Sequence, residues 1–147
     1  MTAMARWASV GVTVVGLAIA LYLTIVHYSG AEAFCGIGHA CVTVQRSAYS
    51  ELAGVPVALL GVLTYGALLG ALLHDGDAAR RVAAGVALTG FGFSAWLTYV
   101  EVAKLEAVCP WCVASAVCMT VLAVLTTRRA GVTAHTVGTR QTRRASA

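Results

Sequence analysis

Two cysteines at a C-x-x-C spacing, Cys109 and Cys112, begin a long apolar segment of the chain. Thiols at this spacing fall within one helical turn and can close a disulfide, and a helix N-terminus stabilises the thiolate of the first of them. Because Pro110 suits the first helical position, we expect Cys109 to be the N-cap residue, with a lowered pKa. The pattern predicts reversible thiol–disulfide chemistry at the end of an apolar helix.

A second cysteine pair, Cys35 and Cys41, lies in a stretch where Gly36 and Gly38 give the chain freedom to close and reopen a bridge. Four cysteines could instead hold zinc, with His39 as an extra ligand. However, the C-x-x-C knuckle occurs only once, whereas zinc sites usually show it twice. We therefore expect redox-active cysteines and no metal.

The composition is that of an integral membrane protein. Hydrophobic residues make up 59% of the chain and charged residues only 11%, which is far from the composition of a soluble domain. Four apolar runs reach the length of about 20 residues that a helix needs to cross the ~30 Å hydrocarbon layer. These runs are Ala8 to Tyr28, Val55 to His74, Val82 to Ala103 and Cys109 to Thr127. We predict an all-α fold, a four-helix bundle that spans the lipid bilayer.

The basic residues predict the orientation of the spans, because cytoplasmic flanks carry an excess of Lys and Arg. With the N-terminus inside, only Arg46 and Lys104 face outward. Eight others lie on the cytoplasmic side: Arg6, Arg80, Arg81, Arg128, Arg129, Arg140, Arg143 and Arg144. We therefore expect a multi-pass protein of the cell inner or plasma membrane, with both termini cytoplasmic. The topology also accounts for the net charge of +4, so no nucleic-acid partner is expected.

This topology places both cysteine pairs on the oxidising, extracytoplasmic side, where disulfides persist. Residues 31–33, Ala-Glu-Ala, have the outline of a signal-peptide cleavage site. The preceding apolar run of about 20 residues exceeds the usual signal core of about 7–15, so we take it as an uncleaved span. Cys118, two turns into the fourth span, is expected to be a small buried hydrophobic residue.

Two segments lie outside the predicted spans. In the first outer loop, Ser29 to Gly54, the residues Val44, Ala48 and Leu52 recur every four positions, which predicts a short amphipathic helix on the membrane surface. Residues 128–147 have no apolar periodicity and are expected to form a basic, disordered cytoplasmic tail. The chain is thus divided into a transmembrane redox domain, residues 1–127, and this tail. Trp111 is interpreted as an aromatic anchor at the membrane interface.

The two cysteine pairs together predict a relay. The loop pair oxidises a dithiol protein outside the membrane, the C-x-x-C pair oxidises the loop pair, and an acceptor dissolved in the bilayer oxidises the C-x-x-C pair. Each exchange requires a thiolate that attacks an accessible disulfide. We expect Cys41 to form the bridge to Cys109, with Cys35 as the alternative.

The order of these features resembles the vitamin K epoxide reductase family, specifically its bacterial homologues. The resemblance rests on the loop pair, on Ser47 six residues after Cys41, on the Gly-Val-Pro-Val-Ala-Leu-Leu-Gly that opens the second span, and on the C-x-x-C of the fourth span. It covers about residues 8–127. The resemblance implies a four-helix bundle around a quinone, with Cys112 facing the quinone and Ser47 near it. It also implies that Cys109 exchanges with Cys35 and Cys41, which act as the shuttle pair.

Two positions depart from the pattern of the animal enzymes. In an ungapped alignment, their quinone-contacting Asn falls on Val57 and their Tyr falls on Ala116. Neither residue carries a hydrogen-bonding side chain, so quinone reduction is expected rather than epoxide reduction. Many bacterial homologues also carry a fused thioredoxin-like domain. We expect the thioredoxin-fold partner of this chain to be a separate protein outside the cytoplasm.

The sequence therefore predicts a membrane thiol:quinone oxidoreductase that generates disulfides in this partner and passes two electrons to menaquinone or ubiquinone. One alternative is a quinone or quinone-epoxide reductase whose useful product is the reduced quinone. Another alternative, from a different class, is a non-enzymatic structural subunit whose disulfides staple its outer face.

Overall fold

The computed structural model of the chain is mostly helical, and it describes residues 3–35 and 40–145, with side chains described as far as Gly131. Gly36, Gly38 and His39 lie outside the described residues. In chain order the elements are α1 (Ala3–Ser29), α2 (Ala40–Gln45), the 3-10 helix η1 (Ala48–Ser50), β1 (Glu51–Leu52), β2 (Val55–Pro56), α3 (Val57–Leu73), α4 (Asp77–Val100), the π-helical turn η2 (Glu101–Leu105) and α5 (Pro110–Ala145).

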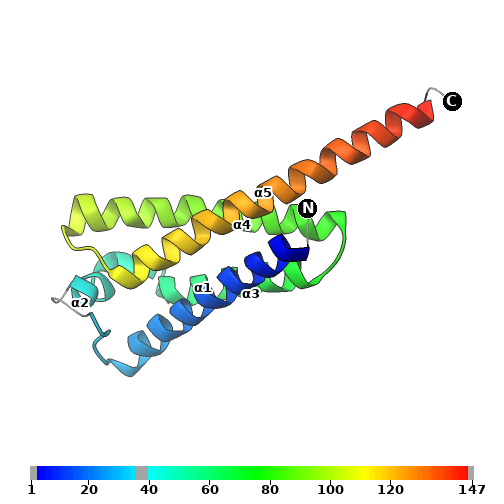
Figure 1. Ribbon diagram of the computed structural model, residues 1–147. Coiled ribbons are helices and arrows are strands. Elements are labelled where there is room, and N and C mark those ends of the chain that lie inside the picture. The colour runs from blue at the N-terminus through cyan, green and yellow to red at the C-terminus, as the bar shows by residue number, and fades with distance from the viewer. Residues whose placement is uncertain (1–2, 36–39, 146–147) are drawn as a thin grey trace.

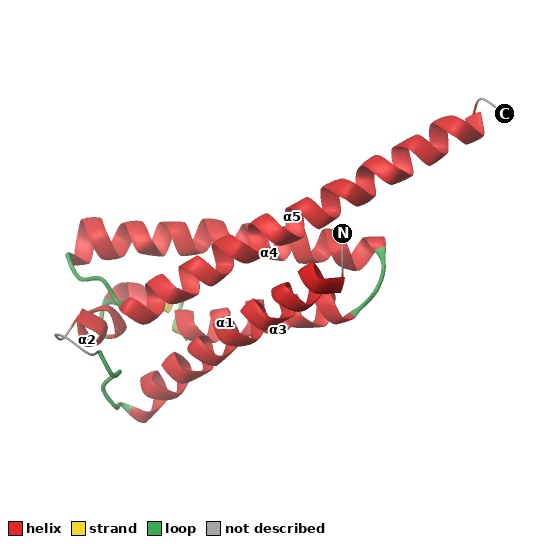
Figure 2. Ribbon diagram, viewed as in Figure 1, coloured by secondary structure: helices red, strands yellow, loops and turns green. Residues whose placement is uncertain are grey.

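The long helices α1, α3, α4 and α5 run side by side, with the loops gathered at their two ends (Figures 1 and 2). One end holds α2 together with the start of α5. The opposite end holds the N-terminal part of α1 and the connection between α3 and α4. The fold thus brings both cysteine-bearing segments to the same end of the molecule.

Within the part of the chain that the structure describes, three helices are long and apolar enough to cross a membrane. They comprise Ala3–Ser29, Asp77–Leu105 and Pro110–Gly131. The remaining predicted span, Val55 to His74, which is second in chain order, corresponds to α3, an apolar helix of 17 residues. It is shorter than predicted because Val55 and Pro56 belong to β2, which pairs antiparallel with β1.

A shared core joins the four long helices. Its buried side chains include Ala20 from α1, Tyr65 and Leu68 from α3, Ala87 from α4 and Leu122 from α5. Such contacts between apolar helices depend on close packing, since lipid is as apolar as the side chains.

Glycine permits the closest of these helix contacts at two positions. A Cβ atom at Gly16 would overlap the ring of Tyr65, and one at Gly90 would overlap the side chain of Met119. A side chain at residue 16 would therefore require the Tyr65 ring to move, whereas the flexible end of Met119 can give way at Gly90.

The outer loop differs from its prediction. A single helix was predicted around Val44 to Leu52, but α2 ends at Gln45 and a β-hairpin begins at Glu51. The Ser47 hydroxyl donates a hydrogen bond to the Val44 carbonyl over 2.8 Å, and such a local bond offers the backbone an alternative to a continued helix. The hairpin then turns through Ala53 and Gly54, both with positive φ.

The segment after Thr127 also differs from its prediction. The sequence predicted disorder from residue 128, whereas α5 continues as a helix to Ala145. The segment contains no proline, so no residue in it lacks the backbone N–H that helical hydrogen bonding requires. Figure 1 shows this part of α5 extending past the other helices.

Arg6 joins α1 to the end of α3, at the end of the molecule opposite the cysteines. Its guanidinium donates to the backbone carbonyls of Leu72 and Leu73, over 3.1 and 2.9 Å, and to the carboxylate of Asp75 over 2.7 Å. The last carbonyls of α3 have no partner within the helix, so an arginine from α1 satisfies them. The start of α1 and the α3–α4 connection therefore lie at the same level.

Candidate functional site

The loop pair is oxidised: Cys35 and Cys41 form a disulfide. Cys41 lies in the first turn of α2 and is fully buried, whereas Cys35 is only partly buried. The Cys41 amide donates a hydrogen bond to the Cys35 sulfur over 3.2 Å. The less buried sulfur of the pair is thus Cys35, and the inner one is Cys41.

The other pair, Cys109 and Cys112, is in the thiol form at the start of α5. The Cys109 carbonyl accepts the amide of Val113 over 3.0 Å, which is the first bond of the helix and makes Cys109 its N-cap residue, as predicted. The backbone N–H groups of Trp111 and Cys112, in the first turn of α5, act on the Cys109 thiol and lower its pKa. The N–H groups at this helix end therefore interact with a thiol.

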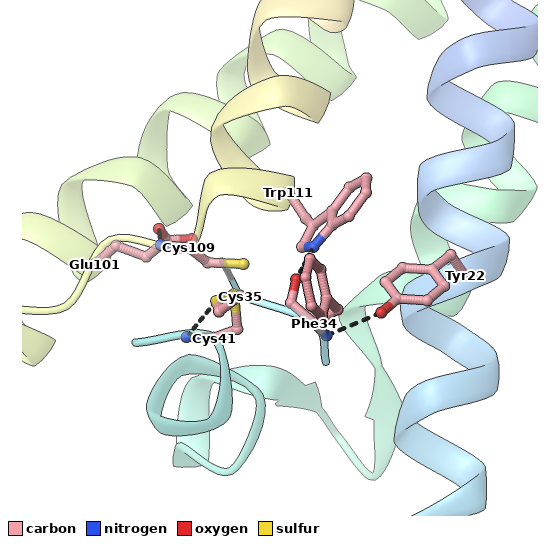
Figure 3. The surroundings of a disulfide bond; sticks show 7 residues. All are labelled: Tyr22, Phe34, Cys35, Cys41, Glu101, Cys109 and Trp111. Atoms are coloured by element: carbon pink, nitrogen blue, oxygen red, sulfur yellow. Dashed lines mark hydrogen bonds between the residues drawn. A yellow bond between two sulfur atoms is a disulfide. The ribbon is translucent and has the colours of Figure 1, made fainter. Parts of the chain in front are cut away.

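The disulfide and the dithiol belong to one cluster of buried side chains. Cys41 and Cys109, both fully buried, pack with Val26 and Ala33, and Cys35 and Cys112 contact the same cluster. In Figure 3 the Cys109 sulfur points toward the disulfide. Cys118 lies apart from this cluster and packs, partly buried, against the shared core.

The environment of Cys109, which precedes the membrane-spanning part of α5, favours its thiolate. The hydrogen bond from the Cys112 thiol is the largest effect, and with the amides of Cys112 and Trp111 it lowers the pKa of Cys109 to about 7. Burial and the nearby charge of Glu101 oppose this change. At neutral pH a large share of Cys109 is therefore a nucleophile.

Glu101 is a site residue that the sequence did not predict. Its side chain is buried, and a carboxylate oxygen accepts the amide of Cys109 over 3.0 Å (Figure 3). Its position inside a predicted span could have flagged it, because ionisable residues within membrane helices are costly and usually functional.

Phe34 is also held in a way that the sequence did not predict. Its amide donates to the Tyr22 hydroxyl over 2.9 Å, and its carbonyl accepts the Trp111 indole N–H over 2.8 Å (Figure 3). The rings of Tyr22 and Trp111 also contact each other, with centroids 5.1 Å apart. Since Phe34 precedes Cys35, this clamp from α1 and α5 holds the loop disulfide over the start of α5.

A cavity lies between the long helices, next to the dithiol. Apolar side chains line most of it, and Cys112, Glu101 and the hydroxyl-bearing Tyr65 and Ser115 also face it. The Tyr65 hydroxyl donates to the Ser115 carbonyl over 2.9 Å and lies 3.0 Å from the Ser115 hydroxyl. Residues of the outer loop border the same cavity: Val44, Gln45, Tyr49 and Ser50.

Four positions were expected at the quinone, Ser47, Cys112, Val57 and Ala116, and Cys112 lines the cavity. Val57 also lines the cavity. Ser47 instead borders a second pocket, which the end of α1 and the outer loop line, and its hydroxyl donates to the Val44 carbonyl. Ala116 is not one of the described residues that line the cavity, whereas its neighbour Ser115 is.

The chain thus combines apolar helices of membrane-spanning length with a disulfide that packs against a dithiol. The chain belongs to the vitamin K epoxide reductase family, whose family model matches residues 7–127. This confirms the resemblance seen in the sequence. A search of curated proteins gives no match. Family membership indicates a membrane oxidoreductase linked in general to quinones.

Proposed function

We propose that this protein is a membrane thiol:quinone oxidoreductase that makes disulfides in an extracytoplasmic thioredoxin-fold protein and reduces a membrane quinone. One observation carries the proposal: the Cys35–Cys41 disulfide packs against Cys109 in a single cluster, while Cys112 borders the cavity. The four sulfurs thus lead from an exposed loop to an apolar cavity.

The relay begins at the loop. A thiolate of the partner attacks the Cys35–Cys41 disulfide, and the partner leaves oxidised while the loop cysteines become thiols. Cys35 is the less buried sulfur of the pair and is therefore the one that the partner reaches.

The second exchange joins the two pairs. The Cys41 thiolate attacks Cys109 in a Cys109–Cys112 disulfide, and the Cys35 thiolate then displaces Cys109 from the mixed disulfide. The loop disulfide is restored, and Cys109 and Cys112 hold the two electrons. This is the redox state of the structure, with the loop pair oxidised and the other pair reduced.

The cavity suits a quinone as the electron acceptor. Ligand sites are mostly apolar, with a few polar groups that fix orientation. Apolar side chains line this cavity, and the hydroxyls of Tyr65, Ser115, Tyr49 and Ser50 supply hydrogen-bonding groups. When bound, the quinone takes up the electron pair of the dithiol. Menaquinone and ubiquinone are the candidates.

The same residues favour a quinone over an epoxide as substrate. Val57 in the cavity wall has no hydrogen-bonding side chain, and Ala116 offers none either. The reduced quinone could still be the useful product of the same reaction, since the chemistry of the site is identical in either case.

We further propose four spans, with α3 as the shortest, in the inner or plasma membrane. Arg6 and the α3–α4 connection lie at the end opposite the cysteines, and that connection leads into Arg80 and Arg81. By the positive-inside rule this end is cytoplasmic, so the cysteines are extracytoplasmic. Residues 1–127 then form the redox domain and residues 128–147 a basic cytoplasmic segment.

The test uses purified protein in lipid vesicles with menaquinone or ubiquinone and a reduced thioredoxin-fold protein, with quinone absorbance followed over time. Wild-type protein should reduce the quinone as the partner is oxidised, and Cys112→Ala should abolish this activity. Cys118→Ala is the matched control and should retain most of it. If the cysteines only staple the outer face, the wild type will not reduce quinone and Cys112→Ala will change stability alone.

A further inference from the structure

The carboxyl group of Glu101 is in an unusual setting for an acidic residue. It lies at the start of η2, where α4 leaves its regular helix, and the residue is only 5% exposed. The ion pairs found among the described residues join Arg6 to Asp75, His27 to Glu51 and Arg80 to Asp77, and none of them includes Glu101. Burying a carboxylate without a cationic partner costs free energy. Its presence here therefore points to a role in the chemistry of the site.

The hydrogen-bond partners of the Glu101 side chain belong to the two dithiol residues. One carboxylate oxygen accepts the Cys109 amide over 3.0 Å. The carboxylate is also an acceptor for the Cys112 thiol, as an alternative to the Cys109 sulfur, because the thiol has a single proton to donate. Glu101 and Cys112 both line the cavity. The carboxylate therefore lies within reach of the thiol proton of Cys112 and borders the space in which an acceptor would sit.

The reaction at this site moves protons as well as electrons. A dithiol and a quinone become a disulfide and a hydroquinone, so two protons must reach the quinone oxygens. Among the described residues that line the cavity, Glu101 carries the sole carboxyl group. Side-chain carboxyl groups are general acids and bases, and a positioned one accelerates proton transfer by about 10²–10⁴-fold.

We propose that Glu101 is the proton-transferring residue of the quinone site, an inference that rests on the proposed function. The Cys112 S–H bond breaks and its proton passes to the Glu101 carboxylate. The Cys109 thiolate forms the S–S bond to Cys112, and the electron pair released passes to the quinone. Glu101 gives its proton to one quinone oxygen, and water supplies the proton for the other.

Glu101→Gln separates proton transfer from structural support. The glutamine carbonyl still accepts the Cys109 amide, but the side chain can no longer take up and release a proton. Glu106→Gln is the matched control, because Glu106 is an exposed residue of the following loop. Each variant is reduced at Cys109 and Cys112, mixed with menaquinone in vesicles, and followed through a single turnover in H₂O and in D₂O.

We expect Glu101→Gln to slow the single turnover by about 10²-fold or more, with Glu106→Gln within twofold of wild type. Glu101→Asp, which keeps the acid, should recover part of the rate, and the solvent isotope effect should differ between wild type and Glu101→Gln. A Glu101→Gln rate within twofold of wild type would overturn the proposal, since a purely structural role survives this substitution.

An infrared measurement without quinone gives an independent readout. Reduction of the Cys109–Cys112 disulfide creates the thiol that can donate to Glu101, so the difference spectrum should contain a carboxyl band that Glu101→Gln removes and Glu106→Gln retains. A difference spectrum without that band in the wild type overturns the role of Glu101. Wild-type protein that shows the band yet never reduces quinone overturns the proposed function instead.

Discussion

The acidity of the Cys109 thiol provides a quantitative test of the site. A pKa lowered to about 7, with the hydrogen bond from Cys112 as the main cause, differs from the ordinary thiol value by about 2, which corresponds to ~3 kcal/mol in favour of the thiolate. About half of Cys109 is then thiolate at pH 7, compared with roughly 1% for a thiol with a pKa near 9. Cys112→Ala removes the hydrogen bond and should raise the pKa of Cys109.

The assay is the ultraviolet absorbance of the thiolate as a function of pH, which does not require a reagent to reach a buried sulfur. Reduced Cys118→Ala protein is compared with the same protein carrying Cys109→Ala, so that the difference reports Cys109 together with its effect on the Cys112 thiol. The absorbance should rise with pH around a midpoint near 7, because the thiolate is the form that absorbs.

Three variants should move this midpoint in different ways. Cys112→Ala should shift it upward by about 1 or more, since the thiol donor is lost. Cys112→Ser keeps a hydroxyl donor and should shift it less. Glu101→Gln should shift it downward, because the Glu101 charge raises the pKa of Cys109. A midpoint that stays in place in Cys112→Ala, or a wild-type midpoint near 9, would refute this account of the thiolate.

Two further predictions concern contacts between distant segments, one a hydrogen bond and one a close helix packing. Trp111→Phe keeps an aromatic ring but loses the N–H donated to Phe34, worth about 1 kcal/mol, so exchange between the loop disulfide and Cys109 should slow roughly fivefold. Rapid acid quenching with mass spectrometry measures that rate, and an unchanged rate would leave Trp111 as an interface anchor only. Gly16→Ala forces Tyr65 to move and should destabilise the protein by about 1–3 kcal/mol in detergent unfolding. A Cβ atom at Gly11 meets open space, so Gly11→Ala should leave the stability unchanged. Equal losses of stability in the two variants would contradict the packing argument.

The sequence was informative wherever a short pattern carries its own chemistry. The C-x-x-C spacing predicted the helix start at Cys109, because thiols, proline and helix ends combine locally. The apolar runs predicted the long helices, since the need to bury or solvate about 20 consecutive apolar side chains leaves few alternatives.

Such local patterns could not predict contacts between segments that are distant in the sequence. Trp111 was interpreted as an interface anchor, yet it bonds to Phe34, 77 positions away in the chain. Glu101 lies in a stretch that reads as one more turn of a span, and only its proximity to Cys109 and Cys112 makes it a site residue. The loop helix was misplaced because the Ser47 hydroxyl and the hairpin at Ala53 override its apolar periodicity.

The central claim is that the two cysteine pairs exchange disulfides, and a trapped mixed disulfide tests it most directly. In Cys35→Ala the remaining loop thiol, Cys41, has no partner to displace Cys109, so oxidation should accumulate a Cys41–Cys109 bridge. Non-reducing peptide mass spectrometry should find the loop peptide linked to the peptide that holds Cys109, and Cys118→Ala should leave this product unchanged. If neither Cys35→Ala nor Cys41→Ala yields a loop peptide linked to Cys109, the pairs do not communicate and the relay is wrong.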